Sequence, residues 1–162
     1  MFNFYLITFY LKYFPGSLFL NSTCFGLSDI ISYMITGFIF KKCGVTKTYV
    51  ISSIIAGIGG ILYLIFHNKK ALIPIFIILS KMGTSMVNNT GYLANSKLFP
   101  PLFSSTSLGL CNLISHLISI LAPILAEVND PYPFIVFVIL NGVSILSAFF
   151  LKELMTNDIK VK

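Results

Sequence analysis

Charged residues are scarce in this chain, and arginine and tryptophan are absent. Of its 162 residues, only 10% are charged and 56% are hydrophobic. A soluble domain has about 25% charged residues, so this composition could not cover a surface that faces water. The scarcity of charge therefore excludes the soluble classes and predicts an integral membrane protein, with the lipid bilayer as its immediate surroundings.

Cysteine is also rare, and its three positions (24, 43 and 111) have no ligand-like spacing. Neither a disulfide framework nor a metal site is predicted. The net charge of +6 comes from 11 lysines against five acids. No basic run is interleaved with exposed aromatic residues, so nucleic acid is not expected as a partner. Because the His-Glu-x-x-His and Gly-x-Ser-x-Gly motifs do not occur, we expect neither an enzyme nor a cofactor.

Long apolar stretches predict membrane-spanning helices, because about 20 apolar residues cross the hydrocarbon core. Five are expected, at about residues 18–40, 48–66, 71–95, 105–126 and 133–151. Another apolar stretch at 2–14 would span only about two thirds of the core at a rise of ~1.5 Å per residue. It indicates the later part of a helix whose beginning is missing. The expected fold is an all-α membrane protein with six helices, the first of them truncated.

Lysine positions predict the orientation of these helices. If the six segments alternate in direction, seven lysines share one side, three share the other, and Lys81 is embedded. Lysine-rich short loops face the cytoplasm. We therefore expect a transmembrane region at 1–151 and a cytoplasmic tail at 152–162. The loop from His67 to Lys70 argues against this orientation, because its two lysines would lie on the opposite side of the membrane.

Three ionisable residues, Asp29, Lys81 and His116, fall near the middle of apolar stretches. A charge at this depth costs at least about 2.5–3.5 kcal/mol, so such residues usually pair or line a path filled with water. One acid, one amine and one imidazole at similar depth predict a shared polar cavity. This arrangement favours solute transport over catalysis.

Polar residues recur every three or four positions in three of the segments, which places them on one face of each helix. In lipid such a face must turn toward protein or water. The alternative is that these residues only hold helices together, as small and polar residues commonly do in membranes. The run from Ala56 to Gly60 fits that structural role. The three stripes contain Ser22, Gly26, Asp29, Tyr33 and Thr36; Lys81, Ser85, Asn88, Tyr92 and Asn95; and Ser105, Gly109, Asn112, His116, Ser119 and Pro123.

Several motifs carry a resemblance to a known family. Leu79–Gly83, followed by Asn89, Tyr92 and Leu98-Phe99-Pro100, is similar to the tenth helix of major facilitator superfamily transporters in the organic cation/anion branch. Leu108–Cys111 is similar to the eleventh helix and Ser28–Tyr33 to the eighth. The chain thus resembles the C-terminal half of such a transporter, helices seven to twelve.

The resemblance implies a substrate path near the membrane midplane. Asp29 stands where the family often has an acid, and Lys81 stands at its basic position in the tenth helix. His116 occupies a position that is acidic in cation carriers and basic in anion carriers. A histidine there does not indicate the charge of the substrate. Departures occur in the family's cytoplasmic charge network, where Lys41 and Lys97 replace acids and Lys152 replaces a proline.

The leading hypothesis is transport of a small organic ion or similar solute by alternating access between two halves. It requires an N-terminal half, missing here, or a second copy of the chain. The alternative hypothesis is a membrane remnant or assembly partner that transports nothing by itself. The residues expected to bind substrate are Asp29, Tyr33, Lys81, Asn88, Asn89, Tyr92, Asn112 and His116.

Overall fold

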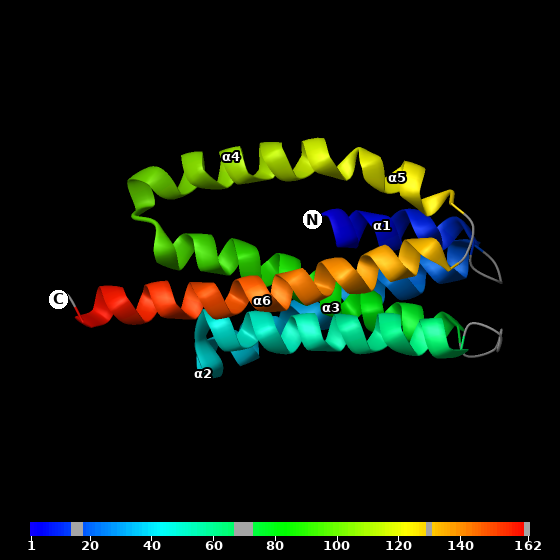
Figure 1. The fold of residues 1–162 in the computed structure, drawn as a ribbon, viewed down its shortest axis with the longest axis horizontal. Helices are drawn as coiled ribbons and strands as arrows, with labels where there is room; N and C mark the ends of the chain where they lie inside the picture. Colours follow the sequence, from blue (N-terminus) through cyan, green and yellow to red (C-terminus); the bar gives the residue numbers. More distant parts are fainter. Residues whose placement is uncertain (14–17, 67–72, 129–130, 161–162) are drawn as a thin grey trace.

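The computed structural model describes residues 1–13, 18–66, 73–128 and 131–160, and every element within these ranges is helical. The expected all-α fold is confirmed for this part of the chain. The elements are α1 (Phe2–Tyr10), the 3-10 turn η1 (Leu11–Tyr13), α2 (Leu18–Phe66), α3 (Ile73–Leu98), α4 (Pro101–Ser119), α5 (Leu121–Ala126) and α6 (Tyr132–Lys160). Figure 1 shows that they run roughly along one common axis.

The long element α2 reverses direction at Gly44, where φ is 77° and ψ is 179°. This conformation is essentially confined to glycine, because a side chain would collide with the backbone. The cyan part of the ribbon in Figure 1 shows the chain turning back at this point. The expected break within residues 41–47 is therefore a sharp turn at a single residue, and the two parts of α2 become separate helical segments.

A proline explains the interruption between α4 and α5. Pro123 has no backbone N–H, and its ring conflicts with the carbonyl group four residues earlier, which belongs to Ser119. Ser119 is the last residue of α4. The two helices nevertheless follow one another along the same edge of the bundle (Figure 1).

Among the described residues, two helical stretches are long and apolar enough to cross a membrane, Phe19–Phe66 and Pro101–Ala126. Tyr132–Ala148 is a shorter apolar helix. The helix α3 has 26 residues but carries many polar side chains. At its far end α6 extends to Lys160, so the helix continues through most of the expected tail at 152–162. The loop expected at His67–Lys70 lies outside the described residues.

The core is formed where α1 meets the second part of α2 and the start of α6. The rings of Tyr63 and Phe134 stack at 3.8 Å between centroids. The hydroxyl groups of Tyr10 and Tyr63 form a hydrogen bond of 3.0 Å. Leu6 and Ile7 are buried in the same cluster. These contacts anchor the short α1 against the longer helices.

Small residues bring α2 and α3 into close contact, as the run Ala56–Gly60 predicted. A Cβ atom added at Gly83 would lie 2.5 Å from the Cα of Ala56. One added at Gly59 would lie 2.6 Å from the backbone nitrogen of Ser80. These distances leave no room for a side chain, so the two backbones approach as closely as small residues allow.

Buried hydroxyl groups in α2 and α3 donate to carbonyl groups of their own helix. Ser32 donates to the carbonyl of Ser28 at 2.6 Å, and Thr36 donates to that of Ser32 at 2.7 Å. Thr90 on α3 does the same toward Met86 at 2.8 Å. Each hydroxyl is satisfied without a partner on another helix, which is a common arrangement in apolar surroundings.

Candidate functional site

Asp29 and Lys81 form an ion pair between the first part of α2 and α3. The Lys81 Nζ lies 3.7 Å from Asp29 Oδ2. The hydroxyl of Ser85, one turn after Lys81, donates to the other carboxylate oxygen of Asp29. The Asp29 carboxylate therefore has a partner for each of its oxygens.

Lys81 is also held by α1. Its Nζ donates to Thr8 Oγ1 at 2.9 Å and lies 3.3 Å from the centroid of the Phe4 ring. The side chain of Lys81 is only 2% exposed, whereas that of Asp29 is 24% exposed. A solute could reach the carboxylate but not the ammonium group. We refer to Phe4, Thr8, Asp29, Lys81 and Ser85 as the charged cluster.

His116 lies outside the charged cluster. It is exposed on α4, and its ring lies 5.8 Å from the ring of Tyr5 on α1, measured between centroids. The structure thus brings together two of the three ionisable groups that were expected to share one cavity. None of the three lines either of the two cavities described next.

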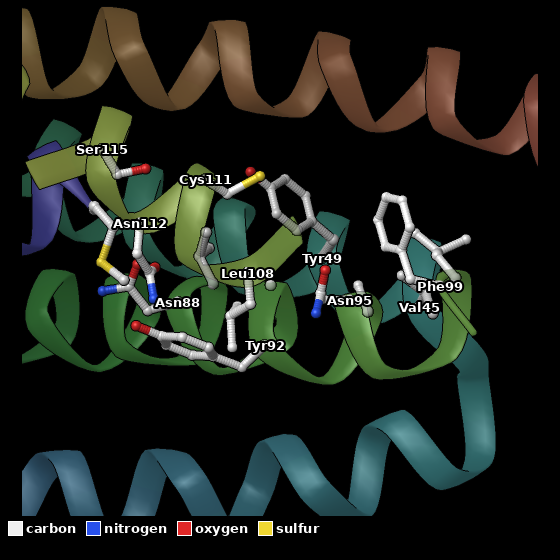
Figure 2. A pocket seen from close by; sticks show the side chains of 15 residues that line it. Val45, Tyr49, Asn88, Tyr92, Asn95, Phe99, Leu108, Cys111, Asn112 and Ser115 are labelled. Carbon is white, nitrogen blue, oxygen red and sulfur yellow. The ribbon is translucent and has the colours of Figure 1, made fainter. Parts of the chain in front are cut away.

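A cavity of about 350 Å³ lies between the later part of α3 and the middle of α4. Figure 2 shows Asn88, Tyr92 and Asn95 entering it from α3, and Leu108, Cys111, Asn112 and Ser115 from α4. Tyr49 and Val45 line it from the second part of α2. A smaller cavity of about 230 Å³ adjoins it and shares Asn88 and Tyr49 among its lining residues.

The amide groups in the larger cavity differ in their hydrogen bonding. Asn95 Nδ2 donates to the carbonyl oxygen and to the hydroxyl of Ser104, at 2.9 and 3.0 Å. This bond ties the end of α3 to the start of α4. Within the described residues, the side chains of Asn88 and Asn112 have no hydrogen-bond partner, and both are partly exposed. Their donors and acceptors are therefore available to a bound molecule.

Three of the eight residues predicted to bind substrate line this cavity: Asn88, Tyr92 and Asn112. Asn89 and Tyr33 line neither of the two cavities. Tyr49 lines both and was not predicted, because it belongs to no polar stripe. Thr8 was also missed as a partner of Lys81. Its signal in the sequence is the single aliphatic hydroxyl of the apolar stretch 2–14, and that hydroxyl does not indicate which side chain it contacts.

Comparison with protein families matches residues 1–159 to the family described as Major Facilitator Superfamily. The match covers all the helices described above except the last residue of α6. No curated protein matches this chain.

Proposed function

Because the chain belongs to the Major Facilitator Superfamily, a family of membrane transporters, we propose that it carries a small organic solute across a membrane by alternating access. The family match over nearly the whole chain is the observation that carries this proposal. The cavity between α3 and α4 supports it, since it offers unpartnered amide groups within a largely apolar bundle. Organic ions are the solutes that the resemblance to the organic cation/anion branch favours.

We propose further that the chain supplies the C-terminal half of a twelve-helix carrier, with its C-terminus in the cytoplasm. The lysines at the Gly44 turn and near the end of α3 support this orientation. One half cannot enclose a path, so an N-terminal half or a second copy would complete it. The DNA upstream of Met1 tests this proposal. An in-frame extension that encodes six apolar segments supports it, whereas a nearby stop codon with a matching transcript end favours a dimer or a remnant.

The charged cluster has a structural role in this proposal. It joins α1, α2 and α3 through one buried ammonium group, and the opposite charges of Asp29 and Lys81 cancel at a distance. We therefore assign contact with the solute chiefly to Asn88, Tyr92 and Asn112. Contact through Tyr33, Asn89 or His116 stays a prediction from the sequence.

Uptake by reconstituted protein tests the assignment. With the protein in liposomes, in the form that its gene encodes, we expect Asn112→Leu and Tyr92→Ala each to lower uptake of labelled organic solutes at least about tenfold. One lost hydrogen bond or aromatic contact of about 1.5 kcal/mol has that effect. The panel contains cations, anions and uncharged compounds, so that no charge is presupposed.

Asn21→Leu is the matched control, because Asn21 is an asparagine of α2 that lines neither cavity and is not among the residues expected to bind substrate. Its uptake should stay within about twofold of the unchanged protein. His116→Ala, measured alongside, tests the prediction for the imidazole. Equal uptake by Asn112→Leu, Tyr92→Ala and the control would show that this cavity is not part of the transport path.

A further inference from the structure

The larger cavity contains no charged side chain. Its lining consists of three asparagines, two tyrosines, a serine, a cysteine and apolar residues. All of these residues belong to the described part of the chain. An ion that entered would lose water without meeting a side chain of opposite charge, and such transfer is costly. The lining side chains therefore disfavour both signs of charge, whereas the backbone amino group of Met1, which also lines the cavity, is a group with which an anion can pair.

The nearest charged side chains do not change this balance. Lys81 and Asp29 form a pair with no net charge, and the Lys81 ammonium is also covered by the Phe4 ring. Lys97 follows Asn95 on α3, but its ammonium lies 4.7 Å from the Phe40 ring centroid and does not line the cavity. No side chain among the described lining residues provides a counter-ion for a solute.

The two unpartnered amides fit a neutral group that both donates and accepts hydrogen bonds. Each asparagine side chain offers two N–H donors and one carbonyl acceptor. Asn88 comes from α3 and Asn112 from α4, and Figure 2 shows both amide groups at the same end of the cavity. A carboxylate could satisfy only their donors and an ammonium only their acceptors. A carboxamide or a cyclic imide satisfies both.

Aromatic side chains complete the site. The ring of Tyr92 lies beside the amide groups in Figure 2, and Tyr49 lines the cavity from α2. Aromatic pairs prefer offset or edge-to-face contact and contribute about 0.5–1.5 kcal/mol beyond area burial. A volume of about 350 Å³ accommodates a planar ring with one substituent.

We infer that this cavity selects an uncharged, planar, amide-bearing solute over organic ions of the same shape. The inference rests on the proposed transport function and narrows its substrate class. Asn88 and Asn112 recognise the amide group, and Tyr49 and Tyr92 contact the ring. This assignment departs from the organic ions that the sequence resemblance favours.

Three probes that differ mainly in charge test the inference: benzamide, benzamidinium and benzoate. Binding to the full chain in nanodiscs is measured by saturation-transfer-difference NMR titration, which suits weak ligands, with empty nanodiscs as the blank. Met1 lines the cavity, so all three titrations are made on protein whose Met1 amino group has been acetylated. With the Met1 amino group acetylated, we expect benzamide to bind at least about tenfold more tightly than either ion, because neither ion then finds a counter-charge.

Two matched variants test whether a charge inside the cavity decides which probe binds best. Asn88→Asp places a carboxylate in the cavity and should move the preference to benzamidinium by about tenfold or more. Asn21→Asp makes the same change on α2, outside both cavities, and should leave the order of the three probes unchanged. A shift of equal size in both variants would indicate a general effect of charge.

Benzamidinium or benzoate binding as tightly as benzamide would overturn the inference, and so would the absence of saturable binding by all three probes. These results differ from failure of the proposed function. In that case the reconstituted protein would bind benzamide with the expected preference, yet it would move no solute of any charge into liposomes.

Discussion

Gly83→Ala is expected to destabilise the protein by about 3 kcal/mol or more, at the upper end of the range for overpacked sites. The added methyl group would lie 2.5 Å from the Cα of Ala56 and even closer to its backbone nitrogen. A flexible side chain could turn away, but a backbone cannot. The segments of α2 and α3 on either side would have to separate, and contacts along their shared length would be lost. The midpoint of thermal unfolding in detergent micelles, followed by circular dichroism, measures the effect.

Gly91→Ala is the control on the same helix. A Cβ atom at Gly91 meets nothing within 4 Å, and alanine favours a helix over glycine by about 0.5–1 kcal/mol. This variant should therefore be as stable as the unchanged protein or slightly more so. The double variant Ala56→Gly/Gly83→Ala should recover little of the lost stability, because the backbone atoms of residue 56 would still collide with the added methyl group. Full recovery would show that the contact with Ala56 is less tight than the structure indicates.

Lys81→Met is expected to cost about 3–5 kcal/mol of stability, the usual effect of removing one partner from a buried ion pair. The Asp29 carboxylate would keep the hydrogen bond from the Ser85 hydroxyl but would lose the ammonium group that balances its charge. Thr8 would lose the ammonium donor that ties α1 to α3. Asp29→Asn should cost at least as much, because it leaves an ammonium group that is only 2% exposed without a carboxylate. Thermal unfolding in micelles again measures both variants.

The double variant Asp29→Asn/Lys81→Met should be more stable than either single variant, because no unpaired charge remains. Lys12→Met is the matched control for loss of a lysine. Lys12 and Glu127 are 3.7 Å apart, but their side chains are 70% and 69% exposed. Water screens such pairs, so little change is expected. If the losses of the two single variants simply add in the double variant, the two charges do not stabilise each other.

The sequence predicts most helix positions because apolar length and helix-breaking residues act locally. The turn expected within residues 41–47 lies at Gly44. The segment expected at 71–95 ends close by, at Leu98. The interruption of the segment expected at 105–126 was missed, although Pro123 is its local cause. The six membrane crossings stay a prediction, because within the described ranges only Phe19–Phe66 and Pro101–Ala126 meet both the length and hydropathy requirements.

The candidate site was predictable only in part. Helical spacing places Asn112 and His116 on one face of α4, yet Asn112 lines the cavity and His116 does not. The difference comes from α1, whose Tyr5 lies next to the His116 ring. Periodicity tells which face of a helix is polar but not which neighbour covers each turn. For the same reason, the pairing of Asp29 with Lys81 was an open possibility, whereas their contacts with Thr8 and Phe4 were not foreseen.

The hydroxyl groups that bond within their own helices have a consequence for motion. Ser32, Thr36 and Thr90 would keep their hydrogen bonds if one helix slid along its neighbour, because donor and acceptor travel together. Shear between helices then breaks van der Waals contacts but few polar ones, and small sliding movements of this kind are a common form of domain rearrangement. The tight fit at Gly83 and the Asp29–Lys81 pair act as fixed points. Rearrangement of this bundle should therefore leave the α2–α3 junction intact and displace α4 and α5 around it.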